Sequence, residues 1–111
     1  MRSIAAQREL DPGQVLNAVA GAPLEKVLQE RGSRYGTFQD HANITQTLKA
    51  IFKSKMGARW DALQDDQKEA LEMIAHKLGR VLNGDPNYAD SWVDIAGYAQ
   101  LVADRLNGTV R

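Results

Sequence analysis

The sequence predicts an all-α protein, an antiparallel bundle of four main helices with a short N-terminal helix attached. Apolar residues recur three and four positions apart through most of the chain, which is typical of amphipathic helices. No useful stretch alternates with a period of two, so no sheet is expected. The 111 residues are enough for one domain with a modest core. We divide the chain into an N-terminal extension, 1–22, and a helical bundle domain, 23–108.

The N-terminal extension is expected to contain a short helix. Asp11 is placed as its N-cap and Pro12 at its first helical position, and Gly21 would end it. Such a short helix is not stable alone, so it needs the body of the protein or a second subunit for support.

Two further helices are predicted before the middle of the chain. Pro23 opens the first, which Gly32 is expected to stop. Thr37 is a suitable N-cap for the second, a long helix that runs to about Met56 and ends at Gly57.

The segment from residue 68 to residue 106 reads as a helical hairpin. Gly84 can take a positive φ and Pro86 cannot continue a helix, so the first helix should end at Asn83. The short connection makes the two helices antiparallel neighbours, whose apolar stripes are expected to face each other. The two stripes are Leu71, Ile74, Leu78, Val81 and Leu82, and Trp92, Ile95, Ala99, Val102 and Leu106.

Each helix of this hairpin also carries a second stripe of long, amphipathic side chains. These stripes are Met73, Lys77 and Arg80, and Asp94, Tyr98, Leu101 and Arg105. Two interpretations remain open: the stripes cover another helix or a second subunit, or they flank a pocket. A salt bridge between Lys77 and Asp94 is the simplest role for those two residues. Because the second stripes and the short first helix need cover, we expect a homo-oligomer.

Composition excludes several classes of protein. The formal net charge is zero, which argues against an electrostatic nucleic-acid binder. No apolar run approaches the ~20 residues of a membrane span, and the N-terminus lacks the apolar core of a signal peptide. There is no cysteine, and only two histidines occur. A cytoplasmic protein without a membrane partner, a thiolate zinc site or a cysteine nucleophile is expected.

Basic and aromatic side chains of the right types for a nucleotide-like ligand are present. Arginine and lysine bind phosphate, and tyrosine can stack on a base. The alternative is that the aromatic residues pack in the core or in turns and that the arginines pair with carboxylates. The candidate ligand-binding residues are Arg34, Tyr35, His41, Lys77, Arg80, Asp94 and Tyr98.

Four carboxylates are candidate ligands of a divalent cation. Glu69 and Glu72 lie three apart on one helix of the hairpin, and Asp90 and Asp94 lie four apart on the other. Acidic pairs on adjacent helices can hold Mg²⁺ through oxygen ligands. The alternative is a solvated acidic face, since Glu72 should lie more than a turn from the level of Asp94. No cofactor other than Mg²⁺ is indicated, and no Ser–His–Asp set or phosphate loop supplies a catalytic residue.

Two resemblances follow from these segments. With ERGSRYGTFQDHA and EALEMIAHKLGRVLNGDPNYADSWVDIAGYAQL, the chain resembles a family of short phage and prophage proteins of unknown function, over roughly Leu24 to Leu106. That resemblance implies a phage origin and a host-cytoplasm location. The acidic pattern is distantly similar to the MazG-type all-α nucleotide pyrophosphatases, which use Mg²⁺. Glu69 and Glu72 match their ExxE motif, whereas Asp90 and Asp94 depart from their ExxD motif.

The leading functional hypothesis is therefore a phage-derived accessory protein that binds a small nucleotide-derived ligand without turnover. Sequestration of a host defence signal would be one use. An Mg²⁺-dependent pyrophosphohydrolase and a protein-binding module are the alternatives.

Overall fold

The computed structural model describes residues 23–111, and within this range the chain forms helices and no strand. The helices are α2 (Leu24–Tyr35), α3 (Phe38–Ala62), α4 (Asp65–Asn83) and α5 (Ala89–Leu106). The all-α prediction is confirmed. The short helix expected within 1–22 lies outside the described residues.

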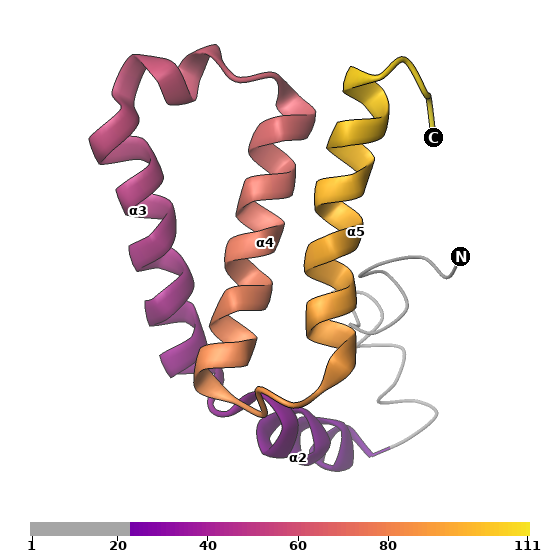
Figure 1. The fold of residues 1–111 in the computed structure, drawn as a ribbon. Helices are drawn as coiled ribbons and strands as arrows, with labels where there is room; N and C mark the ends of the chain where they lie inside the picture. The colour runs from indigo at the N-terminus through magenta and orange to yellow at the C-terminus, as the bar shows by residue number, and fades with distance from the viewer. Residues whose placement is uncertain (1–22) are drawn as a thin grey trace.

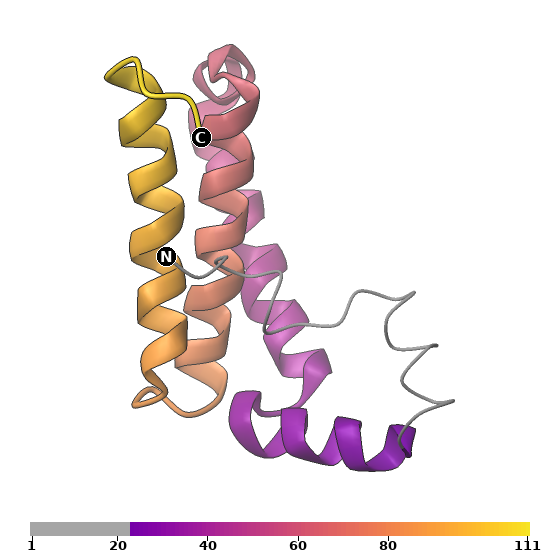
Figure 2. The ribbon, with the colours of Figure 1, turned by 90° about the vertical axis from the view of Figure 1, so that its right-hand side faces the viewer.

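Three of these helices form a layer. Helices α3, α4 and α5 lie side by side with α4 in the middle, and α2 crosses the lower end of the layer (Figure 1). Turned by 90°, the molecule shows α2 extending away from one side of the layer (Figure 2). A bundle of four antiparallel helices is therefore not confirmed, because α2 lies across the other helices rather than along them.

Helix ends follow the sequence signals in part. Thr37 caps α3 as expected, since its side-chain oxygen accepts a hydrogen bond from the Asp40 amide at 3.3 Å. The predicted stop at Gly32 is wrong: α2 continues to Tyr35 and ends at Gly36, whose φ is 77°. A glycine inside a helix costs only about 1 kcal/mol, which the burial of Tyr35 one turn later can offset. At Gly57 the chain bends, with φ 36°, and then continues helically to Ala62.

The expectation that the apolar stripes of α4 and α5 face each other is wrong. Lys77 and Asp94, both from the second stripes, are the largest fully buried side chains of the described residues, with 1% and 0% of their surface exposed. Leu82 and Leu106 of the apolar stripes are 69% and 61% exposed. The reason is that α4 packs against α3 on one side and against α5 on the other. Its apolar stripe therefore lies between these two contacts, on a broad face of the layer.

Close packing of α3 on α4 depends on a glycine. A Cβ atom added at Gly79 would lie 2.7 Å from Cγ2 of Thr45 and 2.9 Å from Cδ2 of His41. Both of those side chains are buried. A larger residue at this position would push the two helices apart.

The far ends of α4 and α5 are joined by an ion pair. The Arg105 guanidinium donates from Nε to Asp66 Oδ2 at 2.8 Å and from Nη2 to Asp66 Oδ1 at 2.6 Å. The hydrogen bonds from Arg105 hold the pKa of the Asp66 carboxyl below its ordinary value, against a smaller opposing effect of burial.

Acid is expected to weaken the fold partly through this ion pair. Because the pKa of Asp66 is lower in the folded chain than in the unfolded chain, the stabilisation is complete above about pH 5 and is lost as the pH falls through the folded value. Urea unfolding at several pH values should show a smaller loss of stability toward about pH 3 for Asp66→Asn than for the wild type. Arg105→Gln, which removes the donor of these hydrogen bonds, should show the same smaller loss. Equal acid losses for all three proteins would contradict this role of Asp66.

No helix among residues 23–111 combines the length and the apolar character that crossing a bilayer requires.

Candidate functional site

A pocket of about 480 Å³ lies where α2, the start of α3 and α4 meet. We call it the corner pocket and define it by Arg31, Tyr35, Phe38, His41, His76 and Arg80. Leu28, Gly32, Gly36 and Thr37 complete its lining. From residues 23–111 the lining receives two arginines, two histidines and two aromatic rings, and no carboxylate.

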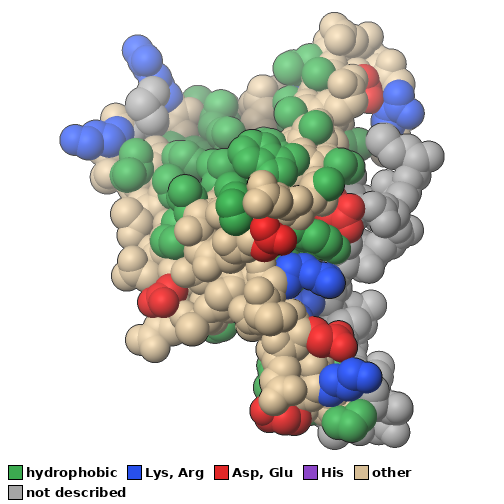
Figure 3. Space-filling view, turned by 60° about the horizontal axis from the view of Figure 1, so that its bottom comes forward, with side chains coloured by type: hydrophobic (Ala, Val, Ile, Leu, Met, Phe, Trp, Pro, Cys, Tyr) green, Lys and Arg blue, Asp and Glu red, His purple; other side chains and the backbone are tan. Residues whose placement is uncertain are grey.

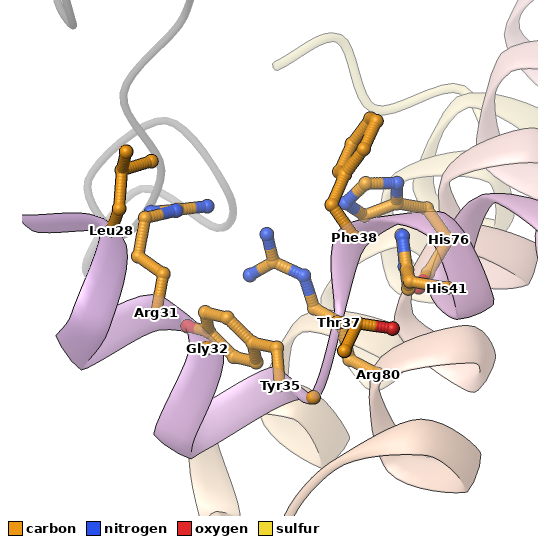
Figure 4. Close-up of a pocket in the computed structure, with 10 residues that line it drawn as sticks. Leu28, Arg31, Gly32, Tyr35, Thr37, Phe38, His41, His76 and Arg80 are labelled. Atoms are coloured by element: carbon orange, nitrogen blue, oxygen red, sulfur yellow. The ribbon is translucent and has the colours of Figure 1, made fainter.

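Arginine and tyrosine side chains form the floor of the corner pocket. The Arg80 guanidinium lies 3.8 Å from the centre of the Tyr35 ring, and the Arg31 guanidinium lies 5.5 Å from it. Figure 4 shows both guanidinium groups pointing toward the space between α2 and Phe38. Stacking on a ring engages the flat face of a guanidinium, whereas its N–H groups lie along the edge. This arrangement brings two positive charges to one surface of the pocket.

Two histidines line the side of the corner pocket next to α4. The rings of His41 and His76 meet edge to face, with centroids 4.5 Å apart. His41 is buried, and its Nε2 lies 2.9 Å from the His76 carbonyl oxygen. This contact places the donor hydrogen on Nε2 of His41, since a carbonyl can only accept. The contact therefore holds the ring in position through its Nε2–H group.

The turn between α2 and α3 is held against the end of α4. The Asn83 side-chain amide donates hydrogen bonds to the carbonyls of Tyr35, at 3.1 Å, and Thr37, at 2.9 Å. Gly84 lies so close to this turn that an added Cβ would be 2.5 Å from Cα of Tyr35 and would also overlap the Arg34 carbonyl. Gly84 has φ −125°, so close approach, not the positive φ expected from the sequence, explains the glycine there.

Of the predicted ligand-binding residues, the structure brings Tyr35, His41 and Arg80 together in the corner pocket. Lys77 and Asp94 instead form the expected salt bridge, with 3.2 Å between Nζ and Oδ2, in the contact between α4 and α5. Tyr98 is half-buried on α5, which contributes no lining residue.

Arg34 also lies away from the corner pocket, over the ring of Tyr88, with 4.5 Å between guanidinium and centroid. The Tyr88 hydroxyl donates to Asp90 Oδ2 at 2.8 Å, and this hydrogen bond together with burial raises the pKa of Tyr88. The alternative reading, in which arginines and aromatic rings pack in turns, therefore describes Arg34 and Tyr88.

The four predicted metal ligands are not gathered. Asp94 faces Lys77, Asp90 accepts from Tyr88, and Glu72 lies 4.0 Å from the Lys53 ammonium. Glu69 is exposed on α4. Within residues 23–111, no three acidic, histidine or cysteine side chains lie close enough together to hold a metal ion.

Sequence reasoning missed Arg31, Phe38 and His76 of the corner pocket. All three stand in a helical spacing that would have revealed them. Arg31 precedes Tyr35 by four residues, and His76 precedes Arg80 by four, so each pair shares one face of its helix. Phe38 precedes His41 by three residues on α3, so this pair also shares a face.

The chain belongs to a family described as a domain of unknown function, DUF6378, which it matches over residues 14–106. Membership in a family of unknown function was expected from the sequence, but the match begins ten residues earlier than the expected start at Leu24 (24 − 14 = 10). No curated protein and no solved structure shows a significant match to the chain.

Proposed function

We propose that the corner pocket binds a small nucleotide-derived ligand without turning it over. The observation that carries the proposal is the lining: arginines, histidines and aromatic rings converge on one cavity, to which residues 23–111 contribute no carboxylate. An anionic ligand would match the basic side chains, and a planar group on it would match the aromatic rings. A volume of about 480 Å³ lies within the range of small-molecule sites.

Phosphate would be held by Arg31 and Arg80. Their guanidinium edges point into the corner pocket, and guanidinium binds phosphate through paired N–H groups (Figure 4). The first turn of α3 adds backbone N–H groups and the positive end of a helix dipole beside Thr37. Phe38, with 82% of its surface exposed at the rim, offers a ring on which a base can stack.

The role we assign is that of a phage-derived accessory protein in the host cytoplasm. Sequestration of a nucleotide-type defence signal would need only a binding site, which the basic and aromatic lining of the corner pocket can supply. This role follows from the resemblance to phage proteins together with the chemistry of the pocket lining.

Arg31→Gln is expected to weaken nucleotide binding at least tenfold, because it removes one of two charges that meet the phosphate. A thermal-shift screen against nucleoside mono- and triphosphates and cyclic nucleotides would identify the ligand, and isothermal titration would give its Kd. Arg34→Gln is the matched control: it removes the same charge three residues along α2, outside the corner pocket, and should leave Kd unchanged. A wild-type protein that no nucleotide stabilises, or equal losses in both variants, would contradict the proposal.

The pyrophosphohydrolase alternative rests on the ExxE pattern of Glu69 and Glu72. It predicts Mg²⁺-dependent release of pyrophosphate from a nucleoside triphosphate, which Glu72→Ala or Asp94→Ala would abolish. Pyrophosphate release that Glu72→Ala removes would replace our proposal with this one. A protein-binding module predicts instead that all nucleotide screens remain silent.

A further inference from the structure

One broad face of the three-helix layer is apolar and remains uncovered by the described helices. Ile51 of α3, Leu71 and Leu82 of α4, and Trp92 and Leu106 of α5 are each between 37% and 69% exposed. We call the surface that these five residues mark the apolar face. Figure 3 shows hydrophobic side chains gathered in a broad area in the upper half of that view.

The geometry of the helices places these residues on the same side of the layer. Lys77 of α4 faces Asp94 of α5, and Leu78 and Ile95 each follow by one residue, or about 100° around the helix. Because α4 and α5 are antiparallel, these two rotations lead to the same side. On α3, Thr45 faces Gly79 of α4, and Ile44, one residue earlier, turns to that side as well, with Ile51 two turns further along the same stripe.

The described residues bury little apolar surface among themselves. Among residues 23–55 and 57–111, the buried hydrophobic side chains are Tyr35, Trp60, Ala70 and Ala75. Domains bury the apolar stripes of their helices between two packed layers, and here the described helices supply one layer. A second layer is needed to remove the apolar face from water.

We propose that this second layer is another copy of the chain, packed face to face in a two-fold symmetric dimer. The apolar face is about 28 Å long, from nineteen residues of α4, and roughly 20 Å wide across three helices, or roughly 560 Å² in projection. That area is near the upper end of the roughly 300–600 Å² that the largest apolar patch of a typical monomer covers. Two such faces together give roughly 1,100 Å², which passes the about 1,000 Å² expected of a specific interface. The five residues that mark the face carry no charge, so it offers nothing to a nucleic acid or to a charged peptide. A second copy of the chain carries the same apolar face, so in a two-fold dimer each copy would cover the apolar face of the other.

The dimer leaves both corner pockets accessible. His76 and Arg80 lie on the opposite side of α4 from Leu78. Each is two residues from Leu78, so each points about 160° away from it around the helix axis. The proposal therefore stands on observations that are independent of ligand binding.

Light scattering of the full chain tests the proposal. The wild type is expected to have twice the monomer mass at micromolar concentration, and the double variant Ile51→Glu/Leu71→Glu is expected to be a monomer with a helical circular-dichroism spectrum. Val93→Glu is the matched control, because Val93 is 52% exposed, as Trp92 beside it is, but lies about 100° further around α5 and off the apolar face. It should remain a dimer. A monomeric wild type, with the apolar face left open or covered by the chain's own N-terminal residues, would overturn the proposal.

A second measurement covers the case in which the charged variant does not fold. The chain has no cysteine, so a single introduced cysteine is its only thiol. Leu71→Cys should give covalent dimers with a short bismaleimide at low micromolar protein, whereas Val93→Cys should not. Equal cross-linking of the two variants would contradict a dimer formed through the apolar face.

Discussion

Replacing Lys77 with methionine is expected to lower the free energy of unfolding by about 3–5 kcal/mol. The substitution nearly conserves side-chain volume, so the loss comes from charge rather than from packing. Asp94, which is fully buried, would remain between α4 and α5 without the ammonium that lies 3.2 Å from it. Urea unfolding at fixed protein concentration, followed by circular dichroism, measures the effect.

The double variant Lys77→Met/Asp94→Leu is the control for this prediction. Removing both charges leaves an apolar contact of similar volume, which is often as stable as the buried ion pair that it replaces. Most of the stability lost in Lys77→Met should therefore return. A double variant no more stable than Lys77→Met would show that packing, and not the loss of the ammonium beside Asp94, causes the effect.

Gly84→Ala is expected to destabilise the protein by about 1–3 kcal/mol. The new methyl group would meet backbone atoms of Arg34 and Tyr35, which cannot rotate away as a side chain can. The strain would separate the end of α4 from the turn that carries Tyr35 into the corner pocket, so ligand affinity should fall as well.

Gly32→Ala provides the comparison for this substitution. Gly32 is inside α2, and an added Cβ there would meet no atom within 4 Å. Alanine should therefore raise stability by about 0.5–1 kcal/mol through its higher helix propensity. Thermal unfolding should move Tm in opposite directions for the two variants. A Tm that falls by the same amount in both would contradict the close approach at Gly84.

Much of the fold could be predicted from local signals. Thr37 as a cap and Asn83 as the last residue of α4 were each indicated by residue types that favour helix ends. What failed was the assignment of faces. A helical stripe shows which residues share a side of a helix, but it does not show where the neighbouring helices lie.

The position of α4 between two neighbours could not be derived from that pattern. Because α3 and α5 pack on opposite sides of α4, polar residues such as Lys77 become buried in a helix contact while Leu82 remains exposed. The same geometry separates Lys77 and Asp94 from the corner pocket, although the sequence grouped them with Arg80. Tyr35, His41 and Arg80 were identified because basic and aromatic residue types suit a phosphate-bearing ligand, wherever the helices place them.

The corner pocket is central to this account of the protein, and an NMR titration tests it most directly. Amide spectra of the wild-type chain would be recorded with increasing amounts of the nucleotide that gives the largest thermal shift. We predict that the shifted amides cluster at Gly32, Gly36, Thr37 and Phe38, with His76 and Arg80 on α4. Saturable shifts centred on α5, or an unchanged spectrum at millimolar nucleotide, would contradict a nucleotide site in the corner pocket.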